Sequence, residues 1–292
     1  MRTTAPIVVA LVAALSACAH APPRASSPTS FHVDVAGHGR PVVFIPDLGA
    51  SGEVWDATLA HLGGRVETHA LTLPGFAGQP PVAGPILPRA ERELASYLRE
   101  KHLRGAVIVG HMFGAALAYA LAVDEPELVG GIVVIDVLPC QAALGEPDQT
   151  RAAAVKEARQ AHDELAAHPP NVEGLQRRLK TMMTDPAPAR MLAEKASLSS
   201  GQAIADAYLE LMTLDLRDGV RKLQPLALVI VTDLTYPPEA WSYIEASWHR
   251  QIDPIPRHEL VVIRGAHHYV MFDKPDEWFA SLDRFLAALP AR

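Results

Sequence analysis

The sequence predicts a mostly parallel, doubly wound α/β sheet with an inserted block of helices. Short apolar runs typical of strands alternate with segments that show the 3.6-residue apolar period of helices, and this alternation is typical of a parallel sheet covered on both faces. Residues 105–110 and 131–136 are apolar almost throughout, as expected of strands buried on both faces. Between about residues 140 and 222 the alternation stops, and helical segments follow one another without a convincing strand.

Each element follows from its own pattern. The elements expected before the interruption are strands at 31–37 and 41–46, a helix at 53–62, a strand at 65–73, a helix at 89–103 and strands at 105–110 and 131–136. Those expected after it are strands at 226–232 and 259–265 and a final helix at 275–289. The first helix, for example, has Val54, Trp55, Leu59 and Leu62 at helical spacing.

Length and composition suit one large domain that carries an insertion. The chain has 292 residues, of which 49% are hydrophobic and 20% are charged, so a sizeable core can form. We expect one folded domain over residues 31–292, with a helical cap at about 140–222. The formal net charge is -7 and no dense Lys or Arg run occurs, which excludes the basic footprint of a nucleic-acid-binding protein.

The N-terminus has the composition of an export signal. Arg2 supplies a short basic region, and the apolar run from Ile7 to Leu15 is too short to span a bilayer. The sequence Leu15-Ser16-Ala17-Cys18 resembles the lipobox of bacterial lipoproteins, which implies a signal peptide at 1–17 and lipidation of Cys18. Residues 18–30 are then expected to be a flexible tether, since they are rich in Ala, Pro and Ser. The alternatives are an ordinary secretory signal that contains a cysteine and an N-terminus that is apolar by chance.

The lipobox resemblance implies a location and a membrane partner. Ala19, rather than an aspartate, follows the cysteine, as in lipoproteins sorted to the outer membrane. We therefore expect a lipid-anchored protein of the bacterial cell envelope, at the outer membrane and facing the periplasm. After cleavage and lipidation only Cys140 keeps a free thiol, so no internal disulfide is expected.

A motif at residues 107–117 joins an apolar strand to an Ala-rich helix through Gly110-His111-Met112-Phe113-Gly114. This layout matches the nucleophile elbow G-x-S-x-G, except that methionine replaces the serine. Three further segments fit the same fold in the same order, namely 42–55, 71–80 and 265–278. Together they resemble the α/β-hydrolase fold family, and in particular its esterase-like members with a helical cap, over about residues 31–290.

The resemblance implies a role for each matching position. Met112 stands where the nucleophile is expected, but a thioether has no proton to give up and is a weak nucleophile. His268, in Gly265-Ala266-His267-His268, matches the base. Asp47, Leu48 and Phe113 match the loop and elbow residues of the oxyanion hole. A carboxylate at position 47 would oppose oxyanion stabilisation, unless Asp47 points to solvent or caps the helix that begins at 53.

The acid of the triad is less well defined. By resemblance it follows the strand at 226–232, where Thr235 occupies the expected position. Asp233, two residues earlier, is one possible replacement. Asp136, at the end of the preceding strand, is another, or it is an ordinary strand-end carboxylate that holds a loop. His268 without a nucleophile is a relic, a hydrogen-bonding pocket residue or a base acting on water.

Other chemistries find less support in the sequence. Cys140 follows a strand at the edge where α/β sheets bind ligands, so a thiol nucleophile is conceivable, although a buried inert cysteine fits as well. No H-x-x-x-H or C-x-x-C spacing predicts a metal site, and there is no G-x-G-x-x-G after an early strand and no P-loop. We therefore expect no metal and no cofactor.

Three functional hypotheses remain at the level of sequence. The first is a pseudoenzyme without serine-hydrolase chemistry that binds a small apolar or ester-like ligand, or a protein, at the cell envelope. The second is an active hydrolase that acts on an ester-type small molecule through a His268-activated water or through Cys140. The third is a structural envelope lipoprotein. The changes at 47, 112 and 235 favour the first.

Overall fold

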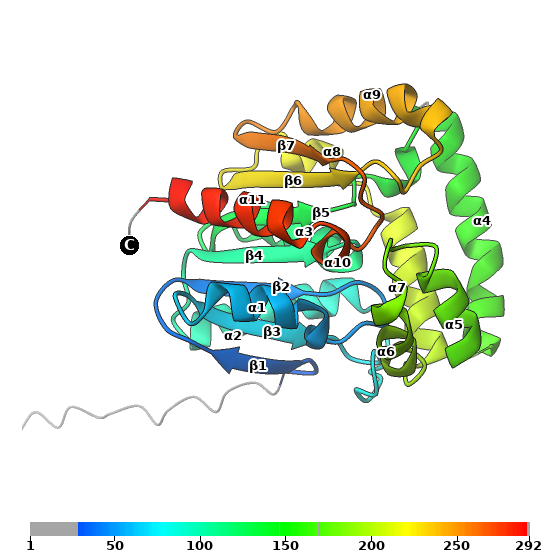
Figure 1. Cartoon of the computed structure of the whole chain (residues 1–292), viewed down its shortest axis with the longest axis horizontal. Helices are drawn as coiled ribbons and strands as arrows, with labels where there is room; N and C mark the ends of the chain where they lie inside the picture. The colour runs from blue at the N-terminus through cyan, green and yellow to red at the C-terminus, as the bar shows by residue number, and fades with distance from the viewer. Residues whose placement is uncertain (1–28, 146, 169, 291–292) are drawn as a thin grey trace, which may run out of the picture.

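A seven-stranded sheet forms the centre of the molecule, in a computed structural model that describes residues 29–145, 147–168 and 170–290. The strand order is β1-β3-β2-β4-β5-β6-β7 (Figure 1). The strands are β1 (His32–Ala36), β2 (Pro41–Ile45), β3 (Glu67–Thr72), β4 (Ala106–His111), β5 (Val129–Ile135), β6 (Leu226–Thr232) and β7 (His258–Ile263). All neighbouring pairs are parallel except β1 with β3, which confirms the predicted fold class.

The edge strand β1 determines where the described chain enters the sheet. Because β1 runs antiparallel to β3, His32 lies opposite Thr72, at the carboxyl end of β3. Just before β1, the backbone N–H and the hydroxyl of Ser30 both donate to Oε2 of Glu93 at 2.7 Å. The chain is thus held where it enters the sheet, at the side where the parallel strands have their carboxyl ends.

Helices cover both faces of the sheet. One face packs against α2 (Leu87–Glu100), α3 (Phe113–Asp124), α8 (Arg217–Val220) and α9 (Trp241–Ile252). The other packs against α1 (Asp56–Leu62), α10 (Val270–Asp273) and α11 (Pro275–Ala288). Short 3-10 helices lie at Gly52–Trp55, Gln141–Ala143 and Pro238–Ala240. The strands β2 and β4 are buried along their whole length, as their continuous apolar runs require.

The segment between β5 and β6 carries four further helices at the carboxyl ends of the strands (Figure 1). They are α4 (Pro147–Ala167), α5 (Val172–Leu179), α6 (Ala187–Ala196) and α7 (Gly201–Thr213), and we call them the cap. Glu210 of α7 accepts hydrogen bonds from the backbone N–H groups of Ile86 and Leu87 at 2.8 and 2.6 Å. The cap thereby satisfies donors at the start of α2 that a helix cannot satisfy itself.

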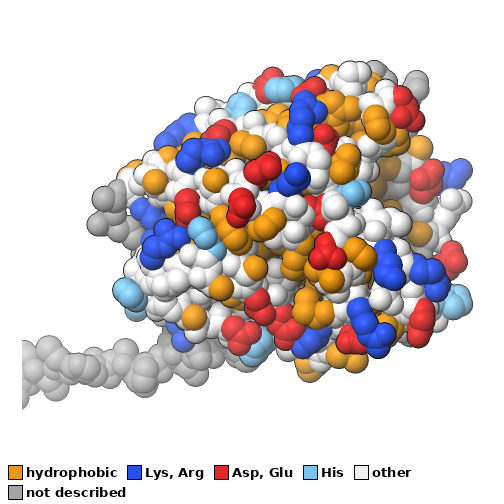
Figure 2. All heavy atoms as spheres, in the orientation of Figure 1, with side chains coloured by type: hydrophobic (Ala, Val, Ile, Leu, Met, Phe, Trp, Pro, Cys, Tyr) orange, Lys and Arg blue, Asp and Glu red, His pale blue; other side chains and the backbone are white. Residues whose placement is uncertain are grey.

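The distribution of surface charge and the length of the helices relate to the expected nucleic-acid and membrane partners. On the face shown in Figure 2, acidic and basic side chains are interspersed over the cap and the sheet domain, without a basic stripe. Within the described part of the chain, no helix combines the length and apolar character needed to cross a membrane. The expected signal peptide, Cys18 and nearly all of the expected tether fall outside the described residues.

Candidate active site

Met112 lies in the sharp turn between β4 and α3, where its backbone has φ 44° and ψ -105°. A positive φ is costly for a residue with a side chain, and such strain persists only when the surroundings impose it. Here Gly110 and Gly114 allow backbone segments to approach so closely that the turn is fixed. A Cβ on Gly110 would lie 2.3 Å from the carbonyl oxygen of Gly114, and one on Gly114 would lie 2.3 Å from that of Ile45. The elbow therefore keeps its strained geometry although its central residue is methionine.

The side chain of Met112 belongs to an apolar surrounding. It is partly buried and packs against the larger of the two cores, together with Leu48 and Ile204 of the cap. Phe113, the next residue, is fully buried and has its ring 6.1 Å from that of Phe76. The position that would hold a nucleophile is thus part of an apolar cluster between cap and sheet.

His268 lies between two carboxylates that come from different loops. Its Nδ1 is 3.1 Å from Oδ2 of Asp136, and its Nε2 is 3.5 Å from Oδ2 of Asp47. Burial by itself lowers the pKa of His268, but the hydrogen bond with Asp136 and the contact with Asp47 outweigh it and raise the pKa to about 9. The imidazole is therefore protonated at neutral pH and balances charge in this buried site.

Asp136 follows β5 and takes the place next to the base that the sequence left open. Its backbone has φ 54°, and its carboxylate accepts hydrogen bonds from the backbone N–H and the hydroxyl of Thr232 at 2.9 and 2.7 Å. The hydroxyl of Thr235 lies 2.7 Å from that of Thr232. Thr235 thus reaches His268 only through Thr232 and Asp136.

Asp233 serves another purpose. Its Oδ1 accepts a hydrogen bond of 2.6 Å from the backbone N–H of Gly265, and its Oδ2 lies 3.7 Å from the guanidinium of Arg264. These contacts join the loops that follow β6 and β7. Of the two candidate acids, the structure brings Asp136 to His268 and uses Asp233 to hold the loop.

Asp47 turns inward rather than to solvent, and it does not cap the helix that follows. Only 8% of the residue is exposed. One carboxylate oxygen, Oδ1, lies 3.4 Å from the backbone nitrogen of Phe113, and the backbone N–H of Leu48 helps to lower the pKa of the carboxyl group. Burial opposes the charge, but the interactions with His268, His111 and Leu48 outweigh it and lower the pKa of Asp47. The Asp47 carboxylate therefore lies beside the two backbone donors expected to bind an oxyanion.

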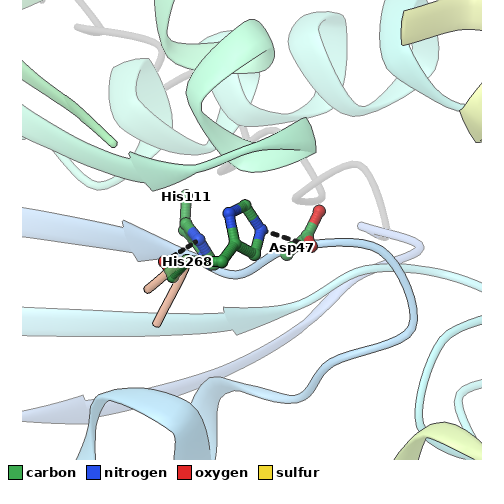
Figure 3. A group of neighbouring side chains, drawn as sticks. All are labelled: Asp47, His111 and His268. Atoms are coloured by element: carbon green, nitrogen blue, oxygen red, sulfur yellow. Dashed lines mark hydrogen bonds and ion pairs between the residues drawn. The ribbon is translucent and has the colours of Figure 1, made fainter. Parts of the chain in front are cut away.

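His111, the residue before Met112, lies against His268 in the same buried cluster (Figure 3). The ring centroids are 4.3 Å apart, and Nε2 of His111 lies 3.1 Å from the backbone oxygen of His268. Burial, with a smaller contribution from the nearby His268, lowers the pKa of His111 to about 3, so this ring is neutral. One ligand atom from each of Asp47, His111 and His268 lies within 4.8 Å of the other two, a grouping that could hold a metal ion.

Cys140 does not join this cluster. It is fully buried, and burial is the largest cause that raises the pKa of its thiol. Its backbone is held by Gln251, which accepts from the Cys140 N–H at 3.0 Å and donates to the Cys140 carbonyl at 3.2 Å. Both ring nitrogens of His268 face carboxylates instead of this thiol.

The sequence analysis missed a set of residues that hold the cap over the site. Asp273 accepts hydrogen bonds from the N–H and the hydroxyl of Thr184, at 2.6 and 2.9 Å, and from the N–H of His267 at 2.8 Å. On the other side, the hydroxyl of Ser199 accepts from the N–H of Ala77 at 2.9 Å. Asp273 ends α10, whereas Thr184, Ser199 and Ala77 lie in loops. The contacts join segments that are distant in the sequence, so they become visible only when the chain is folded.

Comparison with known proteins agrees with the fold. The model of the Alpha/beta hydrolase family matches residues 42–282. The chain belongs to this family. Among curated relatives, a pimeloyl-[acyl-carrier protein] methyl ester esterase of Aeromonas salmonicida is 29% identical over 120 residues, which are 40% of this chain and 45% of that protein. The match thus spans less than half the length of that relative.

Solved structures show the same fold over most of the chain. An esterase from Thermogutta terrifontis has a TM-score of 0.72 at 18% identity, covering 88% of this chain and 93% of that one. An enol-lactonase from Burkholderia xenovorans has a TM-score of 0.69 at 16% identity, with 88% and 96% covered. At these identities the likeness concerns the fold, because function depends on the residues of the site.

Proposed function

We propose that this member of the α/β-hydrolase family has lost serine-hydrolase chemistry and acts by binding, either of a small ligand or of a protein partner. The observation that carries the proposal is the position of the Asp47 carboxylate on the backbone donors of Leu48 and Phe113. The replacement of the nucleophile by Met112 supports it independently.

Acyl transfer at this site meets an electrostatic obstacle. In a serine hydrolase the two backbone donors stabilise the negative charge that develops on the substrate oxygen, and this is usually the largest single contribution to catalysis. Here a resident carboxylate already uses those donors. A second negative charge in the same place would be repelled, so the hole cannot serve its usual purpose while Asp47 occupies it.

The state of His268 also argues against base catalysis. A general base must be unprotonated and must face the group whose proton it removes. The ring of His268 has Asp136 on one nitrogen and Asp47 near the other, and its raised pKa of about 9 keeps it protonated. A water activated by His268 and a Cys140 thiolate are therefore weaker explanations, the second because the Cys140 thiol is fully buried with a raised pKa.

The ligand proposed for this domain is small and apolar or ester-like. Met112 and Leu48 are partly buried apolar side chains that pack against the larger core, and both adjoin site residues in the sequence. The esterase named among the curated relatives acts, by its name, on a methyl ester, which supports the same chemical class for a bound ligand.

We further propose that the domain is tethered to the bacterial outer membrane through a lipid on Cys18 and faces the periplasm. The lipobox resemblance at residues 15–18 and the Ala, Pro and Ser-rich stretch that follows support this. Two or more acyl chains give stable anchoring, because each buried CH₂ contributes about 0.8 kcal/mol.

The test of lost chemistry compares four proteins with short-chain p-nitrophenyl esters and a fluorophosphonate probe, with a chelator present. They are the wild type, Met112→Ser, the double variant Met112→Ser with Asp47→Gly, and its matched control Met112→Ala with Asp47→Gly. We expect only the double variant with serine to be labelled, because it alone has both a nucleophile and a vacated oxyanion hole. Ester turnover by the wild type that disappears in His268→Ala would overturn the proposal.

A further inference from the structure

The cluster of Asp47, His111 and His268 has one property that the proposed function does not use. Two of its ring nitrogens, Nδ1 of His111 and Nε2 of His268, are buried without a hydrogen-bond partner among the described residues. Oδ2 of Asp47 lies 3.5 Å from the second of these nitrogens. Buried polar atoms without partners are costly, so each needs an explanation.

The second nitrogen of each ring has a hydrogen-bond partner that fixes the orientation of the ring. A histidine that binds a metal usually donates its second N–H to a carboxylate or a backbone carbonyl, which fixes the tautomer and the ring orientation. His268 has Asp136 at 3.1 Å from Nδ1, and His111 has the carbonyl of His268 at 3.1 Å from Nε2. Both rings are thus supported in the manner of metal ligands, with the unpartnered nitrogen left for the ion.

Asp47 completes the set. Its Oδ1 faces the backbone N–H of Phe113, while Oδ2 faces His268, so one oxygen is supported and the other is directed to the cluster. The bond lengths of tetrahedral zinc place two ligand atoms about 3.3–3.6 Å apart. The separation of 3.5 Å between Oδ2 of Asp47 and Nε2 of His268 falls in this range. One ligand atom from each of the three residues lies within 4.8 Å of the other two, which is close enough for one ion to bind them all after side-chain adjustment.

Charge favours the same conclusion. Asp47 and Asp136 bring two carboxylates into a region where the residues are 8% and 3% exposed. A divalent cation bound between these residues would balance both charges. Two histidines and a carboxylate are a donor set that suits zinc.

We propose that Asp47, His111 and His268 form a buried binding site for a divalent transition metal, Zn²⁺ in particular, with Asp136 positioning His268. This goes beyond the proposed function, because it assigns a ligand to residues that there only block acyl transfer. Three protein ligands leave one coordination position for water or a bound anion.

The experiment uses the full chain in detergent, without an affinity tag and freed of metal by a chelator that is then removed. Co²⁺ is titrated as a spectroscopic probe and displaced with Zn²⁺, and bound zinc is counted by elemental analysis. We expect one equivalent per chain, visible d–d bands of low-coordinate cobalt, and displacement by Zn²⁺. Asp47→Asn and His111→Gln should each weaken binding by at least about tenfold, and Asp136→Asn by about 10–100-fold.

The control is His267→Gln, which removes the neighbouring histidine outside the cluster and should leave the stoichiometry and the bands unchanged. Circular dichroism checks that each variant is folded. Histidine ring ¹⁵N spectra of the wild type provide a test that needs no cluster variant, since Zn²⁺ should shift Nδ1 of His111 and Nε2 of His268. No stoichiometric binding, or binding that survives Asp47→Asn and His111→Gln, overturns the proposal. The ester assays contain a chelator, so their outcome is independent of this one.

Discussion

The carboxylate of Asp47 lies 3.5 Å from Nε2 of His268, on the side of the ring where a hydrolase of this fold would present its nucleophile. Asp136 lies on the other side, 3.1 Å from Nδ1. The base position is therefore enclosed by two carboxylates in a buried site. The same side chain that blocks the oxyanion donors also holds the histidine, so a single residue alters two parts of the catalytic machinery.

The first prediction concerns the stability of this cluster. In the presence of a chelator, His268→Gln should lower the free energy of unfolding by about 3–5 kcal/mol, because it leaves two buried carboxylates without a cation. Adding Asp47→Asn should restore part of this loss, since one uncompensated charge is removed. Urea unfolding of the wild type, both single variants and the double variant gives the coupling. Strict additivity of the two changes would contradict the pairing of Asp47 with His268.

The second prediction concerns the elbow. Gly114→Ala would place a Cβ 2.3 Å from the carbonyl oxygen of Ile45, a backbone atom that cannot move aside without shifting β2. We expect a loss of about 3 kcal/mol or more in the free energy of unfolding, at the upper end of overpacking effects. Gly174→Ala in α5 is the control and should change stability by less than about 1 kcal/mol. A small effect of Gly114→Ala would show that the elbow is looser than the structure has it.

The third prediction concerns the cap. Asp273→Asn keeps the size of the side chain but replaces one acceptor oxygen by a donor, which faces the donors of Thr184 or His267. Leaving such groups unpaired costs about 1–3 kcal/mol. We expect amide hydrogen exchange to accelerate in α5, α6 and the loop around Thr184, with the sheet unchanged. Asp276→Asn at the exposed start of α11 is the control. Equally faster hydrogen exchange in both variants would argue against the role of Asp273 in holding the cap.

The fourth prediction concerns pH. Burial and the neighbouring Asp124 raise the pKa of Glu91 from 4.5 to about 7. The folded state thus favours the neutral carboxyl, so this contribution is full below pH 4.5 and is lost as the pH rises through about 7. As the pH rises from 4.5 to about 7, the Tm of the wild type should therefore fall relative to the Tm of Glu91→Gln. Glu239→Gln, in the exposed 3-10 helix at Pro238–Ala240, is the control. A pH-independent difference for Glu91→Gln would refute the assignment.

The fifth prediction concerns the membrane. The wild type should partition into the detergent phase and the membrane fraction, whereas Cys18→Ser should not, because it cannot be lipidated. Cys140→Ser is a matched control that removes the other cysteine and should partition like the wild type. Membrane association of Cys18→Ser would exclude the lipid on Cys18 as the anchor.

Much of the fold is visible in the sequence because local patterns determine it. The continuous apolar runs at 226–232 and 131–136 correspond closely to β6 and β5, and the strongly periodic segment at 89–103 corresponds to α2. The helix α9 was not predicted, although Ile244, Trp248 and Ile252 have helical spacing and are buried. In that case the signal was present in the sequence.

The candidate site is less visible because its contacts join distant loops. The sequence left open whether the Asp47 side chain opposes the oxyanion, points to solvent or caps a helix. Its direction depends on backbone donors at Leu48 and Phe113. The expectation of no metal site rested on ligand spacing along the chain. Asp47 follows β2, His111 ends β4 and His268 follows β7, and the carboxyl ends of these strands come to the same side only after the parallel sheet has formed.

The antiparallel course of β1 has a mechanical consequence. His32 lies opposite Thr72, so the described chain enters the domain at the sheet edge that also carries Asp47, His268 and the cap. A force applied through the polypeptide ahead of residue 29 would act first on Ser30 and Glu93 and then on this edge strand. Tension through a tether at Cys18 would therefore reach the domain at the end of the sheet that bears the site.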